Sequence, residues 1–313
     1  MNKPVTREET YLAAMSGAEV NLPRPVTREE YYLAAGAGMD VDLPDPITRK
    51  ELFLKRIAER GGNGEGSGGG EDAFLAYVNN TLEEVDSDAI QSVRYYTFLD
   101  KTAIRRVNLP ECTKFGVQAF KNCTGLEEVR LEKFTGGNHG SVMEIFAGCS
   151  GLHTIHVPEI DTVPASFLRN CISLKNFLFG SKLGWMNDYC LANTAIEVFA
   201  APSVVYMTNG VFCDCRQLEK VDITLSQTNC SLGNTAFKNC EKLKTLILRA
   251  TNRVVTLGNV GAFEGTPFAA GGSGGTVYVP AARISEYQQA TNWSTLYAAG
   301  TCVFAAIEGS EYE

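Results

Sequence analysis

Cysteine is the residue type with the widest chemical repertoire in this sequence, and it occurs ten times in 313 residues. A thiolate can bind a metal ion or attack an electrophile, so the spacing of the cysteines decides which chemistry is open to them. The closest two are Cys213 and Cys215, and no Cys-x-x-Cys pair occurs. Because zinc sites are usually built from such closely spaced ligand pairs, this spacing disfavours a metal site.

Five of the cysteines occupy the same position of a repeating pattern. They are Cys123, Cys149, Cys171, Cys215 and Cys240. In other copies the position is taken by Asn193 and Thr266, so it favours small side chains. Free cysteine packs as a small apolar residue. We therefore expect a buried ladder of unpaired thiols, with no disulfide needed in a chain made in a reducing cytoplasm.

Other residue types that support catalysis are sparse. Of the three histidines, His139 lies in a glycine-rich loop, and the spacing of His153 and His156 predicts opposite faces of a strand. The neighbouring acids Glu127 and Glu128 fall at positions expected to face solvent. No serine or cysteine lies in a nucleophile motif, and no group of acids has the spacing of metal ligands. We expect no catalytic, metal-binding or cofactor-binding residues, and we predict that the protein is not an enzyme.

These side chains are carried on a repeat that runs from about residue 96 to residue 268. Its clearest copy starts at Phe120 and reads Phe-x-x-Cys-x-x-Leu-x-x-Val-x-Leu. Copies begin at residues 98, 120, 146, 168, 190, 212, 237 and 263, which is typical of a stacked-repeat solenoid. The Val-x-Leu part predicts a short strand with alternating inward side chains, and the Phe-x-x-Cys part predicts a tight helical turn. We therefore predict a mostly β/α solenoid over residues 73–313, although the copies at Leu168 and Cys190 lack the phenylalanine.

The longer copies contain insertions between the strand and the next copy. The insertions span residues 132–141, 224–234 and 249–261, which is one place in the repeat. A solenoid displays such insertions on one edge, where they are either tolerated loop growth or a binding face. For a binding face, the candidate receptor contacts are polar residues in these insertions: Asn138, His139, Gln227, Asn229, Asn252 and Arg253.

Residues 1–60 contain a different, 21-residue repeat, whose copies begin at Pro4, Pro25 and Pro46. Each copy starts with Pro-Val-Thr-Arg or Pro-Ile-Thr-Arg, and its threonine is followed three residues later by glutamate. This spacing is that of a capping box, in which the two side chains cap the start of a helix. The three pairs are Thr6 and Glu9, Thr27 and Glu30, and Thr48 and Glu51. The repeat predicts an array of three short helices, each of the first two followed by an extended connector.

Each predicted helix is about ten residues long, which is too short to be stable in isolation. Its apolar stripe must therefore be buried against another surface. The residues of the stripe are Tyr11, Leu12, Tyr32, Leu33, Phe53 and Leu54. Their partner is either another copy of the chain, a scaffold protein, or the other two helices of the same chain. We favour the first two and assign residues 1–60 to anchoring and oligomerisation.

Two further segments divide the chain. The glycine-rich stretch 61–72 should behave as a flexible linker. Residues 276–313 should cap the solenoid with a strand, a helix from Ala281 to about Tyr297, a closing strand over 301–307 and an acidic tail.

Charge and hydropathy exclude two classes of partner. The net charge of −8 argues against nucleic-acid binding, which usually needs a basic surface. No run approaches 18 apolar residues, so we expect no membrane insertion, and the first residues lack the apolar core of a signal peptide.

Two motifs carry a resemblance to known families. The Phe-x-x-Cys-x-x-Leu-x-x-Val-x-Leu units resemble BspA-type leucine-rich repeats, and the stretches 277–280 and 287–294 are similar to the usual end of that family. That family is found in bacterial surface proteins and in structural proteins of phages that infect gut bacteria. The N-terminal Pro-[Val/Ile]-Thr-Arg-x-Glu repeat resembles the N-terminal segments of such phage fibre proteins.

The combined resemblance implies a non-enzymatic virion protein, a head or tail fibre or a capsid decoration, displayed on the virion surface. The N-terminal repeats would bind a phage capsid or tail protein and form a homotrimer, and the leucine-rich repeat domain would attach to a host cell-surface glycan or protein. The alternative is a BspA-like adhesin at a bacterial cell surface, against which the missing signal peptide counts. An enzyme with an accessory repeat domain is the third hypothesis.

Overall fold

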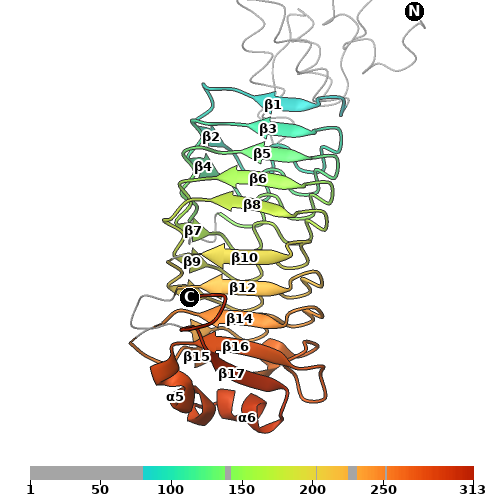
Figure 1. The fold of residues 1–313 in the computed structure, drawn as a ribbon. Coiled ribbons are helices and arrows are strands. Elements are labelled where there is room, and N and C mark those ends of the chain that lie inside the picture. Colours follow the sequence, from blue (N-terminus) through green and yellow to red (C-terminus); the bar gives the residue numbers. More distant parts are fainter. Residues whose placement is uncertain (1–79, 138–141, 202, 225–230, 251) are drawn as a thin grey trace, which may run out of the picture. The chain divides into compact units, whose positions relative to one another are not determined.

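The computed structural model describes residues 80–137, 142–201, 203–224, 231–250 and 252–313. The chain divides into two compact units, Met1–Leu82 and Glu83–Glu313. The second unit is a parallel β-solenoid of about nine turns (Figure 1). The N-terminal repeats, the glycine-rich linker and most of a short helix expected over residues 73–80 lie outside the described residues, so those expectations stay predictions.

One strand of every turn belongs to the main face of the solenoid, which consists of two five-stranded parallel sheets stacked along one axis (Figure 1). The first sheet contains β1 (Glu84–Asp86), β3 (Arg106–Asn108), β5 (Glu128–Arg130), β6 (Thr154–Val157) and β8 (Asn176–Phe179). The second contains β10 (Val198–Ala201), β12 (Lys220–Ile223), β14 (Thr245–Leu248), β16 (Gly275–Val279) and β17 (Cys302–Ala306).

A second face is formed by two-residue strands, which are also parallel. One pair is β2 (Ser92–Val93) with β4 (Lys114–Phe115). The other sheet contains β7 (Thr162–Val163), β9 (Trp185–Met186), β11 (Tyr206–Met207), β13 (Ser231–Leu232) and β15 (Thr256–Leu257). Most turns thus run from a main-face strand to a short second-face strand and return through a tight turn. No second-face strand follows β5 or β16 in the described residues.

The alternation of apolar residues explains the main-face strands, as the sequence predicts. In β5 and β6, Val129, Ile155 and Val157 point inward and are fully buried. Val129 pairs in register with Ile155, so equivalent residues of successive turns meet in the core. Burial of each such side chain contributes about 1.5–3 kcal/mol, and the stacked turns supply the area that one turn alone cannot bury.

The Phe-x-x-Cys part forms a tight turn, but the prediction that it is helical is wrong. Gln118 and Asn122, two residues either side of Phe120, have φ angles of 56° and 60°. The amides of Phe120 and Asn122 donate to the carbonyls of Ile145 and Ala147 on the next turn, both at 2.8 Å. An amide that donates along the stack cannot donate to the fourth residue back, as a helix requires. The solenoid is therefore a β-solenoid with little helix, and not a β/α-solenoid.

The same backbone pattern corrects the start of one repeat. Left-handed residues flank the anchor position on both sides in the turns from Phe98 to Phe237, and in this turn they are Tyr189 and Asn193. The anchor is therefore Leu191, and not Cys190 as an even spacing from Leu168 suggested. The residue in the cysteine column is then Thr194, which is buried, and not Asn193. The sequence alone misplaces this copy by one position because its neighbours lack a phenylalanine landmark.

The anchor side chains build two aromatic stacks in the core. Phe120 lies 4.6 Å from Phe98 and 5.3 Å from Phe146, measured between ring centroids. A second stack joins Phe237 to Phe212 at 5.8 Å and to Phe263 at 5.4 Å. Leu168 and Leu191 occupy the anchor position between the two stacks and are fully buried. The missing phenylalanines therefore change the packing without interrupting the core.

The C-terminal cap differs from the single helix expected there. The segment forms η2 (Ala281–Arg283), α5 (Ile284–Gln289) and α6 (Trp293–Ala298), after an earlier short helix, η1 (Val260–Phe263). The helices break at Asn292, whose φ of 68° is left-handed. The Trp293 indole donates to the Val255 carbonyl at 2.7 Å, and the Val255 amide donates to the Tyr287 hydroxyl at 3.0 Å. The cap thus covers the last turn and provides hydrogen-bond partners for the amide and carbonyl of Val255.

Among the residues that the structure describes, no helix has the length and apolar character needed to cross a membrane.

Candidate binding surface

The cysteine column is confirmed as a buried ladder. Its five members are completely buried and unpaired. Each thiol donates to the carbonyl of the anchor residue one turn earlier, at sulfur–oxygen distances of 3.0 to 3.2 Å. Burial in this apolar interior raises the pKa of Cys215 to about 11 and the pKa of Cys149 well above its ordinary value. These thiols are therefore protonated at neutral pH and support packing rather than chemistry.

The histidines lie differently from the prediction of opposite strand faces. His153 precedes β6 and is exposed, and His156 is an outward residue of β6, so neither points into the core. The alternation rule fails here because the strand begins only at Thr154. His156 Nδ1 lies 3.1 Å from Glu132 Oε1. Within the described residues, no group of three His, Cys, Asp or Glu side chains could hold a metal ion.

The insertion residues proposed as receptor contacts are only partly described. Asn252 is exposed, and Arg253 is half-buried with its Nε atom buried and without a hydrogen-bond partner. The remaining candidates, Asn138, His139, Gln227 and Asn229, lie outside the described residues. The helix-capping and stripe residues of positions 1–60 also lie outside them. The binding role of the insertions stays a prediction.

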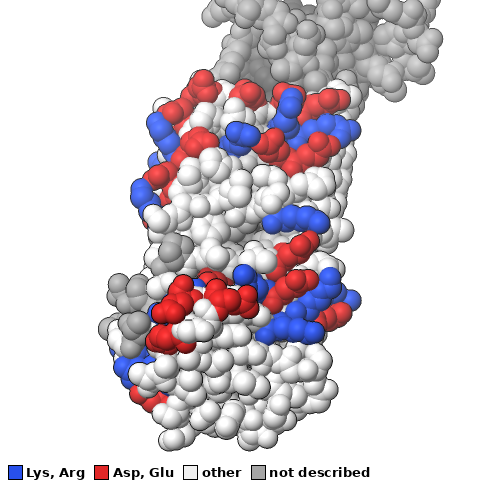
Figure 2. All heavy atoms as spheres, viewed as in Figure 1, with Lys and Arg blue, Asp and Glu red and all other residues white. Residues whose placement is uncertain are grey.

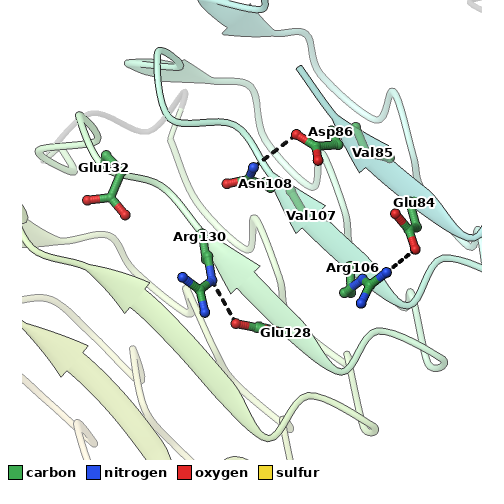
Figure 3. Close-up of a pocket in the computed structure, with 9 residues that line it drawn as sticks. All are labelled: Glu84, Val85, Asp86, Arg106, Val107, Asn108, Glu128, Arg130 and Glu132. Carbon is green, nitrogen blue, oxygen red and sulfur yellow. Dashed lines mark hydrogen bonds and ion pairs between the residues drawn. The ribbon is translucent and has the colours of Figure 1, made fainter. Parts of the chain in front are cut away.

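A shallow depression of about 410 Å³ lies instead on the main face, over the first turns of the solenoid (Figure 3). Outward residues of β1, β3 and β5 line it, together with Glu132, which follows β5. The lining residues are Glu84, Val85, Asp86, Arg106, Val107, Asn108, Glu128, Arg130 and Glu132. The alternation of each strand places the charged members outward, and the parallel register aligns them from turn to turn.

Polar contacts between successive turns organise the depression. Arg106 of β3 forms an ion pair with Glu84 of β1, and this hydrogen bond raises the pKa of the guanidinium (Figure 3). Asn108 donates to the Asp86 carboxylate at 2.9 Å. The Arg130 Nε donates within β5 to Glu128 at 2.7 Å. Because these pairs are exposed, they contribute little to stability, and they remain available to a ligand.

The middle of the main face carries an apolar band, defined here as Leu178, Val198 and Ala200. These residues point outward from β8 and β10, and Leu178 and Val198 are 48% and 52% exposed. Figure 2 shows this uncharged region between charged groups over the first turns and others over the later turns. Exposure of large aliphatic side chains to water is unfavourable, so the band is a candidate contact surface.

An exposed aromatic pair lies on the second face. Trp185 of β9 is 43% exposed, and its ring centroid lies 5.4 Å from that of Tyr206 on β11. The two residues belong to different copies of the repeat, and only the parallel pairing of β9 with β11 makes them neighbours.

One pattern in the sequence predicts the main-face surface, although the overall composition does not show it. Outward positions recur once per turn, and the series Glu84, Arg106 and Glu128 alternates in charge. Taken one strand at a time, these residues are typical of a solvated face. Only the stacking of the turns brings them together into one surface.

The repeat geometry agrees with a comparison against family models. The model of the BspA type leucine rich repeat region matches six copies, over residues 70–137 and 142–266. The chain belongs to this family. The BspA-type match begins at residue 70, so it does not include the N-terminal repeats of positions 1–60. No curated protein matches the chain.

Two solved structures are similar to this BspA-type chain. One is a leucine rich cell surface protein from Faecalibacterium prausnitzii, with 19% identity and a TM-score of 0.41 over 59% of this chain and 59% of that one. The other is a leucine-rich repeat protein from Bacteroides ovatus, with 17% identity and a TM-score of 0.33 over 73% of this chain and 79% of that one. The similarity to the first thus spans little more than half of either chain.

Proposed function

We propose that this BspA-type repeat protein is a non-enzymatic adhesin of a bacterial cell surface, and that its main face binds a protein on another surface. The apolar band is the observation that carries the proposal. Protein-binding surfaces typically have an apolar centre and a polar rim. Here Leu178 and Val198 form the centre, while the depression on β1, β3 and β5 provides a polar rim on one side.

The charge of the rim narrows the type of partner. Four carboxylates and two guanidinium groups line the depression, so it is unsuited to a polyanion such as nucleic acid. Both signs of charge lie close together, which favours a polypeptide partner with complementary pairs. A cell-surface glycan is the other partner implied by the family resemblance, and the exposed pair of Trp185 and Tyr206 is a surface on which a sugar ring could stack.

The location at a bacterial surface rests on the family. BspA-type repeats are found in bacterial surface proteins, and a repeat solenoid suits display because it offers a long face on a rigid frame. Absence of a catalytic constellation from the sequence supports a binding role.

A virion fibre or decoration protein is the second candidate function, and the N-terminal repeats favour it. The three short helices predicted from the capping boxes, each too short to be stable alone, would suit a homotrimeric anchor on a capsid or tail protein. In that arrangement the same main face would contact the host cell.

Attachment of labelled protein to target cells tests the main face. We expect Leu178→Asp and Val198→Asp to reduce attachment at least about tenfold, because each places a charge in the apolar centre. Ile172→Asp is the matched control, since Ile172 is also an exposed aliphatic residue, at 55%, but lies outside the strands of the main face. Equal attachment of all three variants and the wild type would place the site elsewhere. Deletion of residues 136–140 would then test the insertion edge.

Treatment of the target cells separates the partner classes. Loss of attachment after trypsin, but not after periodate, is expected for a protein partner, and the reverse result would identify a glycan. Antibodies against the solenoid should label intact bacterial cells for an adhesin. Labelling of purified phage particles, with a trimeric mass of the full chain in solution, would support the virion role instead.

A further inference from the structure

The acidic end of the chain folds back over the main face, with Glu311 and Glu313 exposed and Tyr312 half-buried. The C-terminal segment, defined as residues 308–313, follows β17 through a turn at Gly309, whose φ is 76°. Glu308 Oε2 accepts a hydrogen bond from the Ala281 amide at 2.8 Å. The Tyr312 amide then donates to Ser310 Oγ at 3.1 Å, and these contacts shape the segment into a compact hook.

Tyr312 is the residue through which this hook contacts the sheet. Its ring lies 4.7 Å from the ring of Tyr278 in a T-shaped arrangement, and Lys220 Nζ lies 5.4 Å from its centroid. The Thr245 side chain lies next to the phenol. The Arg249 guanidinium donates to the Tyr312 carbonyl at 2.8 Å. The four contacting residues belong to three successive turns, on β12, β14 and β16, or directly follow β14.

Arg249 is held in place for this contact by a residue outside the segment. Its Nε and Nη2 atoms donate to the two carboxylate oxygens of Asp222, at 2.7 and 2.9 Å. This two-point contact with a neighbouring strand fixes the plane of the guanidinium, so Nη2 presents a donor at a defined position on the face. A preorganised donor lowers the entropy lost when a peptide carbonyl binds to it.

The burial of Ile247 shows how much the hook covers. Ile247 points outward, since its neighbours Leu246 and Leu248 point inward, yet it is completely buried. Its register partners are Asp222 and Tyr278. Leu178, in the same outward column of an uncovered turn, is 48% exposed. The contacts of Tyr312 lie on or next to the strand of Ile247 and on both neighbouring strands, so the hook lies over the part of the sheet that contains Ile247.

We propose that Lys220, Thr245, Arg249 and Tyr278 form a binding site for a tyrosine-bearing acidic peptide, and that the C-terminal segment occupies it as a removable internal ligand. The site offers an apolar floor at Ile247, an aromatic wall at Tyr278 and the Lys220 ammonium over the ring face. Carboxylates flank the tyrosine in the segment, at Glu311 and Glu313. The inference is independent of what the apolar band binds, because the ligand is a segment of this chain.

Fluorescence anisotropy with a labelled synthetic peptide of residues 307–313 tests the site. The chain truncated after residue 307 should bind this peptide with a dissociation constant on the order of 100 µM, since a short peptide with one anchored side chain binds weakly. The full chain should bind it at least about tenfold more weakly. Its own segment competes at an effective concentration on the order of millimolar.

Three controls complete the experiment. A peptide with the Tyr312→Ala change should not bind, and Lys220→Ala in the truncated chain should weaken binding at least about fivefold. Lys244→Ala is the matched control, because Lys244 is an exposed lysine next to β14 and lies outside the contacts of the Tyr312 ring. It should leave binding unchanged.

Several results would overturn the proposal. They are a folded truncated chain that fails to bind at millimolar peptide, equal binding of the two peptides, and equal binding by the full and truncated chains. If truncation prevents folding, a full-length Tyr312→Ala chain should bind the wild-type peptide in its place. If that variant also fails to fold, the segment is part of the core and is not a removable ligand.

Discussion

The cysteine ladder keeps its protons because each sulfur lies in an apolar interior and has a carbonyl to which it donates. A thiolate at Cys149 or Cys240 would lose its hydration, and no neighbouring cation would stabilise its charge. The same reasoning separates these residues from Cys213, which is half-buried in a turn. The reactivity of each thiol therefore depends on whether its position in the turn is buried or half-buried.

Thiol labelling tests this difference. In a Cys230→Ser background, because Cys230 lies outside the described residues, we expect the ladder cysteines to resist iodoacetamide at pH 7.5 for hours. Cys213 should label first, though slowly, since burial raises its pKa to about 12. All remaining thiols should label in urea. Rapid native labelling of Cys149 or Cys171, measured by mass spectrometry of peptides, would contradict a buried ladder.

The ladder also predicts a loss of stability at alkaline pH. Burial raises the pKa of Cys215 to about 11, above its ordinary value of 9.0. Its contribution is therefore fully present below pH 9 and is lost as pH rises towards 11, at up to about 1.4 kcal/mol per pH unit. Urea unfolding at pH 7.5, 9 and 10 should show this fall. Cys215→Thr, which introduces the residue found naturally at Thr194 and Thr266 of the same column, should have a shallower fall.

The position of Leu191 as an anchor leads to a third prediction. Thr194→Cys should change the free energy of unfolding by less than about 1 kcal/mol, because it restores the usual residue of the column. Asn193→Val should cost at least about 1–2 kcal/mol, since Asn193 has a φ of 56° that a β-branched residue tolerates poorly. Urea unfolding measures both. The reverse order would restore Cys190 as the anchor.

At the scale of elements, the turns are held together by stacking rather than by helices. Asn122 donates to Asp100 at 2.9 Å and Asn239 to Asp214 at 2.8 Å, which forms a polar ladder along the left-handed positions. Gly148 and Gly265 have no side chain, so the ladder is interrupted at these two positions. A Cβ at either would clash with the side-chain amide oxygen of Asn122 or Asn239. The turns therefore depend on their neighbours, and the last turn depends on the cap.

The packing of the cap predicts that the Trp293 side chain contributes strongly to the stability of the protein. Trp293→Ala should destabilise the protein by about 3–5 kcal/mol, because the indole is fully buried against Phe263 and Phe304 and donates to the Val255 carbonyl. Tyr297→Ala is the control on the same helix, since Tyr297 is 44% exposed, and it should cost less than about 1.5 kcal/mol. Urea unfolding followed by circular dichroism gives both values. Similar effects of the two changes would argue against the cap as described.

At the scale of the molecule, every turn contacts mainly the turns before and after it, so the number of turns is not critical to the fold. Thr154 pairs with Asn176 in the register of β6 and β8, so residues 154–175 make up one complete turn. Deletion of residues 154–175 should therefore remove that turn and let β8 stack on β5. Deletion of residues 154–164, half of that length, would bring inward residues of one turn against outward residues of the next.

The two deletions give opposite outcomes in solution. The whole-turn deletion should leave a soluble protein with a β-type circular dichroism spectrum and a cooperative, somewhat less stable unfolding transition. The half-turn deletion should yield aggregated or unfolded protein. If both variants fold equally well, the stacking register does not control the fold.

How well the sequence predicts the structure differs between the core and the surface. The strand positions, the burial of the cysteines and the presence of a cap followed from the residues, because side chains that recur once per turn must meet in the same layer of the core. Residues without a strong landmark were harder to place, as Cys190 and Leu191 show. The scarcity of helix in the described turns depends on backbone hydrogen bonds between turns, for which no residue type is diagnostic.

The sequence by itself determined that this chain is a solenoid of BspA-type repeats with a buried ladder of thiols. Only the tertiary structure decided which outward residues form a surface. The depression at Glu84 and Arg106, the apolar band at Leu178 and Val198, and the site occupied by Tyr312 each combine residues from two or more turns. Inward positions are dictated by a local alternation of apolar residues. Surface neighbours are dictated by the register between turns and by the path of the chain after the last strand, which are properties of the folded molecule.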